Sequence, residues 1–276
     1  MAAILISRGT MAGGEMLALC LSQKLGVPMV SREDLVSLVN KHGAKADEVL
    51  NRLDRATNNY EQFSKLRRPY IILMRLALLE FMLQGDFIYH GYSGHLLLPD
   101  LPCSLKVRVI APMEQRVKSA MDRLHIAEKE EARAEVERRD EARIKWARFM
   151  YGQDIRNPAL YDVCFHLGTL DISSICEMIS ASNDAPELRR TPEAKKRLMD
   201  MHLSSLVETV LVTDPATSAL EIGAKANCGS ILLEGPFLES ERLEQVTEMV
   251  ASLPGVERVE YEPGCPFGLE YGPVYY

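Results

Sequence analysis

The first thirty residues carry the pattern that most constrains the fold of this chain. Residues 3–7 are short and apolar, and two glycines follow at positions 13–14. Residues 15–25 place apolar side chains at helical spacing, and residues 27–30 predict the next strand. Strand, glycine turn, helix and strand in this order predict a parallel sheet, because parallel neighbours need a crossover connection.

Three later apolar segments predict further strands of the same sheet, over residues 87–90, 105–110 and 162–167. Between and after them, helical patterns extend over residues 32–84, 114–151 and 173–182. We therefore predict an α/β fold in which helices wrap a parallel sheet, over residues 1–182.

The rest of the chain predicts a second, smaller module. A polar linker and the start of a helix occupy residues 183–199, where Thr191 followed by proline is typical of a helix N-terminus. Residues 200–262 continue as helix, strand, strand, helix, strand, which predicts a small αββαβ domain. Residues 263–276 form a tail rich in Gly, Pro and Tyr.

The composition narrows the class of protein and of partner. The net charge is −7 and the pI is about 5.5, which opposes a general role in nucleic-acid binding. The apolar run at the N-terminus is too short for a signal peptide, and residues 70–83 are interrupted by Arg75 and Glu80. We expect a cytoplasmic protein that does not span a membrane. The cysteines are scattered without CxxC pairs, so no metal site is predicted.

Five short elements occur in one order along residues 3–182. They read I-L-I-S-R-G-T-M-A-G-G-E-M-L-A, L-G-V-P-M-V-S-R-E-D-L, F-I-Y-H-G-Y-S-G-H-L-L, L-K-V-R-V-I-A-P-M-E-Q-R-V, and R-R-D-E-A-R with D-I-R-N-P-A-L-Y-D-V. Together they resemble the cytidylate-kinase-like family, which has the phosphate-loop nucleoside monophosphate kinase fold. A lone glycine pair is weak support, and the ordered set is stronger.

The resemblance implies a phosphotransferase that uses ATP and Mg²⁺. In such kinases, backbone amides of a glycine loop and a helix N-terminus bind the donor phosphates. On this chain the resemblance assigns donor binding to Ser7, Arg8, Gly13 and Gly14. The alternative is that the two glycines only form a tight turn.

The lid of the family matches a charged helical segment. The resemblance implies catalytic roles for Arg139 and Arg143, which lie one helical turn apart, and for Asp140 between them; Arg116 is also retained. The alternative is that these are solvated surface charges, since charge runs usually are.

The acceptor side matches less well. The resemblance assigns substrate binding to Ser31, Arg32, Gly91, Tyr92 and Asp162. Tyr92 stands where the family has an Arg, and Ser31 where it often has an Asp. Asp162 has the alternative of a local cap or pair.

The glycine loop departs from active kinases at three positions. Gly14 stands where true cytidylate kinases have the loop Lys, and Met16 where they have the hydroxyl on the magnesium side. Glu15 places an anion where the subgroup often has a basic residue. These changes predict weak ATP binding and slow transfer, because the charge that neutralises the donor phosphates is missing.

The C-terminal module has a resemblance of its own. G-S-I-L-L-E-G-P and L-P-G-V-E-R-V, over residues 200–262, resemble a BON domain. That resemblance implies a protein or lipid partner.

Two functions follow from these resemblances. The first is a nucleotide-binding protein that transfers phosphate from ATP to a nucleoside monophosphate such as CMP. The alternative is a catalytically degenerate nucleotide-sensing or scaffold protein that acts through its BON-like module. Fold alone does not choose between them.

Overall fold

A computed structural model describes residues 3–39, 64–91, 93–98, 100–183 and 185–264. Contacts divide these residues into two compact units. One unit contains the described residues of 1–34 and 85–190, and the other contains those of 35–84 and 191–273.

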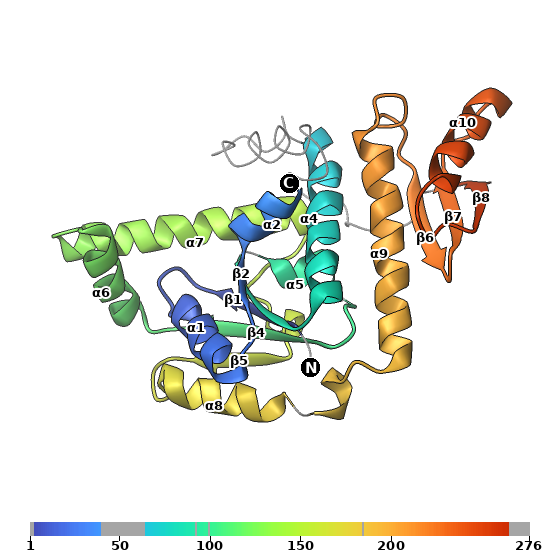
Figure 1. The fold of residues 1–276 in the computed structure, drawn as a ribbon. Coiled ribbons are helices and arrows are strands. Elements are labelled where there is room, and N and C mark those ends of the chain that lie inside the picture. The colour runs from blue at the N-terminus through green and yellow to red at the C-terminus, as the bar shows by residue number, and fades with distance from the viewer. Residues whose placement is uncertain (1–2, 40–63, 92, 99, 184, 265–276) are drawn as a thin grey trace. The chain divides into compact units, whose positions relative to one another are not determined.

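The first unit is built on a parallel sheet of five strands in the order β2-β3-β1-β4-β5 (Figure 1). The strands are β1 Ala3–Arg8, β2 Met29–Ser31, β3 Phe87–His90, β4 Ser104–Ile110 and β5 Val163–His166. This arrangement confirms the predicted fold class. β1 is central, and the chain builds first on one side of it and then on the other. The loop after β1 therefore lies at the switch point where α/β sheets bind ligands.

Helices follow the strands of this sheet. Their bounds are α1 Gly14–Leu25, α2 Arg32–Val39, α5 Gly94–Leu97, α6 Met113–Leu124, α7 Lys129–Tyr151 and α8 Ile172–Ser182, with short 3₁₀ turns at Pro158–Leu160 and Pro186–Leu188. α1 packs against β1, β3 and α8. Leu17, Ala18 and Leu21 on its inner face are completely buried, as its helical spacing of apolar residues predicts.

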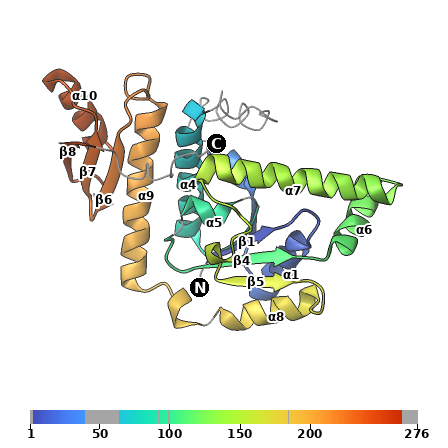
Figure 2. The same cartoon turned by 180° about the vertical axis from the view of Figure 1, so that it is seen from behind.

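The segment 114–151, predicted as one helical stretch, is two helices. His125 adopts a left-handed conformation (φ 56°) that ends α6, and α7 begins at Lys129. The two helices pack together around Val117, Ala120, Ala132 and Val136, so both lie in one hairpin (Figures 1 and 2). The prediction of one helix was wrong because the pattern of charged surface residues continues through the segment that separates α6 from α7. The break at His125 lets the apolar residues of the two helices pack against each other.

The second unit contains helix α4 Ser64–Gln84 together with α9 Pro192–Thr213, β6 Gly223–Asn227, β7 Ser230–Gly235, α10 Ser240–Ala251 and β8 Arg258–Pro263. α4 packs along α9, and α9 packs on β6. β6 and β7 are antiparallel, and β8 is parallel to β7. The predicted order αββαβ is observed. Of the helical segment predicted over residues 32–84, residues 40–63 lie outside the described residues.

The hairpin between β6 and β7 turns at Cys228 and Gly229, both with positive φ (49° and 81°). Two consecutive residues with positive φ form a turn whose twist matches that of the antiparallel strands on either side. The small sheet and its helices enclose a core that includes Val207, Ile231 and Leu233. The sequence predicts domain boundaries at residues 182 and 200, and these boundaries stay a prediction. The second unit also contains α4, which precedes them in the chain.

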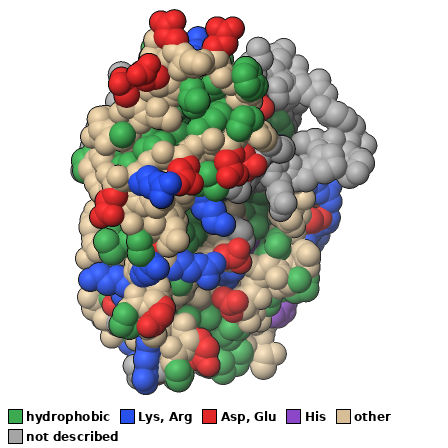
Figure 3. Space-filling model, turned by 90° about the vertical axis from the view of Figure 1, so that its right-hand side faces the viewer, with side chains coloured by type: hydrophobic (Ala, Val, Ile, Leu, Met, Phe, Trp, Pro, Cys, Tyr) green, Lys and Arg blue, Asp and Glu red, His purple; other side chains and the backbone are tan. Residues whose placement is uncertain are grey.

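Charges of both signs share the face drawn in Figure 3. Lys and Arg side chains cross it as a band, with Asp and Glu side chains above and below that band. Among the described residues, no helix is both long enough and apolar enough to span a bilayer.

Candidate functional site: two arginine-lined cavities at the glycine loop

The glycine loop connects the end of β1 to the start of α1. Gly13 precedes the helix with φ 75°, a conformation that favours glycine, and a Cβ there would lie 2.9 Å from Leu167 Cδ1. α1 then begins at Gly14, and the first amides of a helix have no partner within it. The backbone geometry is therefore that of an anion-binding loop.

A clamp from the α6–α7 hairpin holds the loop at Thr10. The backbone N–H of Thr10 donates to Asp140 Oδ1 at 2.8 Å, and Arg116 Nε donates to the Thr10 carbonyl at 2.7 Å. Arg116 also forms an ion pair with Asp140. Burial alone would raise the pKa of Asp140, but the hydrogen bonds from Thr10 and Arg116 outweigh it and lower that pKa. Asp140 is therefore an anion committed to holding the loop.

A cavity of about 270 Å³ opens over the loop, and we call it the loop cavity. It is lined by Arg8, by loop and helix residues 10–16, and by Ser119, Arg123, Arg139 and Arg143. Four arginines thus face one acid, Glu15, across this cavity. The charge balance favours an anionic ligand.

Three of these lining charges, Arg123, Glu15 and Arg139, have charged partners. Arg123 Nη1 donates to Glu15 Oε2 at 2.9 Å, and this hydrogen bond lowers the pKa of Glu15. Arg139 Nε donates to Glu135 Oε1 at 2.6 Å. Glu135 also receives two hydrogen bonds from Arg138, and the two arginines lower its pKa to about 2.

A second cavity of about 190 Å³ adjoins the first, and we call it the arginine cavity. Its polar lining is Arg8, Arg108, Arg116, Asp140, Arg143 and Arg156; the rest is Gly9, Ile110, Ala111, Ile144 and Ile155. Arg8 and Arg143 line both cavities. The only acid, Asp140, is already bonded to Arg116 and Thr10. A small anion fits this lining better than a neutral ligand does.

Arg108 is the least exposed arginine of this cavity. Its residue is 9% exposed, and it donates to Ser7 Oγ at 3.4 Å and to the Tyr161 hydroxyl at 3.1 Å, both through Nη1. Its guanidinium carbon lies 5.4 Å from the centre of the Tyr161 ring. Within the described part of the chain, Arg108 makes no ion pair with a carboxylate. A buried cation without a counter-ion favours an anion from outside the chain.

Tyr161 connects Arg108 to the rest of the wall. Its hydroxyl donates to the Ile155 carbonyl at 2.8 Å, and its ring lies 4.5 Å from the ring of His95. Burial, with the nearby charge of Arg108, lowers the pKa of His95 to about 3, so this imidazole is neutral.

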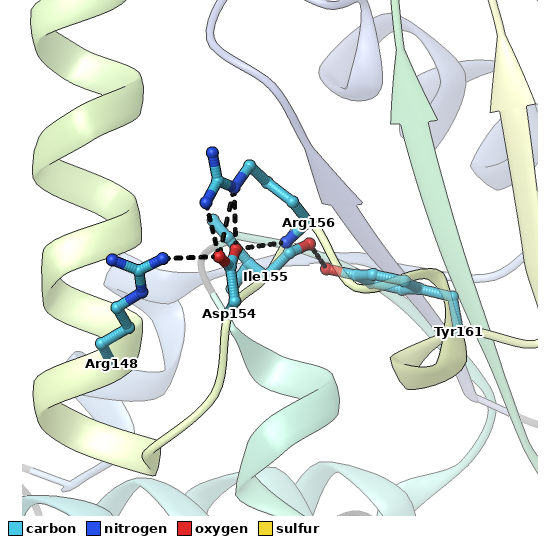
Figure 4. Close-up of polar contacts among 5 residues, drawn as sticks. All are labelled: Arg148, Asp154, Ile155, Arg156 and Tyr161. Carbon is cyan, nitrogen blue, oxygen red and sulfur yellow. Dashed lines mark hydrogen bonds and ion pairs between the residues drawn. The ribbon is translucent and has the colours of Figure 1, made fainter. Parts of the chain in front are cut away.

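The segment after α7 forms another wall, drawn in Figure 4. Asp154 accepts from Arg148 Nη2 at 2.8 Å and from Arg156 Nη2 at 2.6 Å, and the amide of Arg156 also donates to it at 3.0 Å. The hydrogen bond from Arg156 is the largest cause that lowers the pKa of Asp154. Arg156 therefore borders the cavity with its charge largely satisfied.

Comparison with known proteins decides the family. Residues 3–169 match the cytidylate kinase-like family. The chain belongs to that family. Membership supports a nucleotide-binding, kinase-like protein, and kinases of this kind generally use ATP and Mg²⁺. A search of the curated proteins found no match.

Solved structures are similar to the cytidylate kinase-like part of the chain. An uncharacterized protein from Eubacterium ventriosum is 16% identical with a TM-score of 0.51, over 67% of this chain and 99% of that chain. TT1252 from Thermus thermophilus is 18% identical with a TM-score of 0.45, over 66% and 97%. A shikimate kinase from Bacteroides thetaiotaomicron is 14% identical with a TM-score of 0.37, over 65% and 97%.

The structure brings together most of the residues to which the family resemblance assigns donor binding or catalysis. Arg8, Gly13, Gly14, Arg139 and Arg143 all line the loop cavity. The roles of these residues stay predictions. Two further assignments have other contacts. Ser7 is buried and bonded to Tyr161 at 3.1 Å, and Asp140 holds Thr10.

The acceptor-side residues are not gathered in either cavity. Ser31 and Asp34 bond to each other at the start of α2, next to Arg32. Gly91 lies against Tyr89, since a Cβ there would be 2.4 Å from the Tyr89 hydroxyl. The prediction for Tyr92 lies outside the described residues.

Asp162 lies at the other end of the sheet. It precedes β5, and its Oδ2 accepts from the Lys106 amide at 2.7 Å. The loop follows the carboxyl end of the parallel strand β1, whereas Asp162 stands at the amino end of β5. The contact with Lys106 gives Asp162 a structural partner, and its role in substrate binding stays a prediction.

Three lining residues were not predicted from the sequence: Arg108, Arg123 and Arg156. Arg108 had a usable signal, because it is a charged residue inside an otherwise apolar strand segment, V-R-V-I. A charge in a central strand is rarely buried without a role. Arg123 and Arg156 lie on helix and loop surfaces that offer no such signal.

The loop has the Thr10 hydroxyl as a possible oxygen ligand for Mg²⁺, but both acids that line the two cavities are paired with arginines. That ion takes one or two carboxylates together with substrate phosphates. Here Glu15 and Asp140 are both paired with arginine, and Met16 has no oxygen in its side chain. Among the described residues, no group of three His, Cys, Asp or Glu could hold a metal.

Proposed function

We propose that this protein binds the phosphates of a nucleoside triphosphate in the loop cavity and the phosphate of an acceptor, such as CMP, in the arginine cavity. The observation that carries the proposal is that Arg8 and Arg143 line both cavities. A donor and an acceptor bound in this way would have both arginines between their phosphates.

Transfer between such sites needs mainly positioning and neutralisation of charge. An oxygen of the acceptor phosphate forms the new bond to the γ-phosphorus of the donor. The bond from that phosphorus to the bridging oxygen breaks, and the nucleoside diphosphate leaves with the electron pair. Arg8 and Arg143 would stabilise negative charge on the transferred group, and Thr10, fixed by Asp140 and Arg116, would keep the loop in place.

The second candidate is a nucleotide-sensing or scaffold protein without turnover. The residues that favour it are Gly14, Glu15 and Met16, which supply neither the lysine nor the hydroxyl of active kinases. Its output would be the C-terminal αββαβ module, which we propose is BON-like and binds a protein or a lipid.

Calorimetry with ATP and with CMP, each with and without Mg²⁺, tests the binding proposal, and a phosphoryl-transfer assay then separates the two candidates. The kinase proposal expects both ligands to bind and a slow but measurable appearance of CDP. Binding without turnover would favour the sensing protein. No heat with any of these nucleotides would contradict both.

A further inference from the structure

Arg8 occupies the space that a side chain on residue 14 would need. A Cβ built on Gly14 would lie 2.5 Å from Arg8 Cδ and 2.9 Å from Arg8 Cβ. Both distances are far below an ordinary carbon–carbon contact of about 3.5–4.0 Å. Gly14 is not in a left-handed conformation, so its backbone does not require glycine. Glycine is required at position 14 because the neighbouring side chain of Arg8 leaves no room for a Cβ.

One nitrogen of the Arg8 guanidinium, Nη1, lacks a hydrogen-bond acceptor within the described part of the chain. This nitrogen is buried. A buried donor without a partner destabilises a fold, and more so when it is charged, so natural proteins seldom keep one without a reason. Here the donor belongs to a side chain that lines both cavities.

The acidic side chains that line the cavities with Arg8 already have hydrogen-bond partners. Glu15 is hydrogen-bonded to Arg123, and Asp140 is bonded to Arg116 and to the Thr10 amide. The lining of the two cavities contains no further acid. The partner that Arg8 lacks is therefore an anion from outside the chain.

We propose that Arg8 takes the place of the missing loop lysine and binds the terminal phosphoryl oxygens of a polyphosphate ligand. This inference rests on the proposed function and deepens it. The positive charge of the site comes from the end of β1 rather than from the start of α1, and Gly14 is the substitution that leaves room for it. Arg8 and a lysine at position 14 exclude each other.

Calorimetry with inorganic tripolyphosphate tests directly whether Arg8 replaces the loop lysine. Arg8→Ala should weaken binding about tenfold to hundredfold, the range expected for loss of a charged hydrogen bond. Gly14→Lys in the wild-type background should also weaken binding, because the new side chain displaces Arg8. Arg8→Gly combined with Gly14→Lys removes every side-chain atom of residue 8 that opposes a side chain on residue 14, so it should return the affinity to within about threefold of the wild type. Arg138→Ala, which removes an exposed arginine outside both cavities, is the control for loss of net charge.

Thermal unfolding of the same proteins gives a reading that needs no ligand. Gly14→Ala should lower the Tm in the wild type and have little effect once Arg8→Gly is present, because glycine also removes the Cβ of residue 8. Equal tripolyphosphate binding by the wild type and by Arg8→Ala would overturn the inference and leave the proposed function standing. No tripolyphosphate binding by the wild type would overturn both.

Discussion

At the scale of single residues, the charge of Glu15 depends on its partner. Alone, an acid at the start of α1 would repel a phosphate. Arg123 reaches it from α6, so the pair presents less negative charge to the cavity than the sequence implies. Both side chains are about half exposed, and such a pair contributes little stability.

Glu15→Gln should therefore strengthen the binding of ATP about threefold to tenfold, because it removes the anion and releases Arg123 toward the cavity. The free energy of unfolding should change by less than about 1 kcal/mol. Calorimetry and urea denaturation measure the two effects. Glu114→Gln is the control, since Glu114 is also exposed and paired with basic side chains but lines neither cavity. Weaker binding by Glu15→Gln would show that Glu15 itself contacts the ligand.

Arg138 and Arg139 form a matched pair of residues. Both bind Glu135 on the same helix, but only Arg139 lines the loop cavity. Arg139→Ala should weaken ATP binding about tenfold, and Arg138→Ala should leave it within about twofold. Equal effects would mean that Arg139 acts only through net charge. Arg143→Ala should weaken ATP binding at least as much as Arg139→Ala does, because Arg143 lines both cavities.

At the scale of elements, the α6–α7 hairpin is the support of the glycine loop. α6 supplies Arg116 and α7 supplies Asp140, and together they fix both the N–H and the carbonyl of Thr10. The break at His125 makes this possible, since it lets α7 return alongside α6. A single continuous helix could not place both side chains at one loop residue.

Asp140→Asn should lower the free energy of unfolding at pH 7 by about 1–3 kcal/mol, because it leaves Arg116 without its carboxylate. The native state lowers the pKa of Asp140, so its stabilisation is complete above the unfolded pKa of about 3.9 and is lost as the pH falls through the folded value. The difference between the wild type and Asp140→Asn should therefore shrink below about pH 4. Urea denaturation across this range measures it. Asp122→Asn, at an exposed position of α6, is the control for loss of one carboxylate. A difference between the wild type and Asp140→Asn that is constant with pH would rule out the ion pair as its source.

At the scale of the whole molecule, the second unit combines segments that are far apart in the sequence. Arg75 on α4 lies 3.6 Å from Glu208 on α9, and Arg68 donates to the carbonyl of Ile222. Glu208 is buried, which raises its pKa despite the nearby arginines. The family match includes α4, but α4 packs on the helix that leads into the small sheet.

A fragment of residues 191–264 should therefore be less stable than the same residues in the full chain, because it lacks the partner of α9. Thermal unfolding followed by circular dichroism should give a lower Tm, and a synthetic peptide of residues 64–84 should raise it. A peptide with Arg68→Ala and Arg75→Ala should raise it less. An unchanged Tm, with no effect of either peptide, would show that the C-terminal segment folds independently.

The sequence by itself determined the strand order along the chain, the glycine turn and the helix that follows it. These features depend on local spacing of apolar residues and on the conformational freedom of glycine, which a linear pattern records. The same holds for Arg139 and Arg143, whose separation of one helical turn puts them on one face.

Only the tertiary structure decided what the charges do. Arg8 fills the space of residue 14, Arg123 pairs with Glu15, and Asp140 binds Thr10 from a distance of 130 residues in the chain. Arg108 is enclosed by strands and loops that meet only in the folded unit. The physical reason is that electrostatic and packing contacts act through space. The same charged residue in the sequence can face a counter-ion, a backbone amide or a cavity in the folded chain.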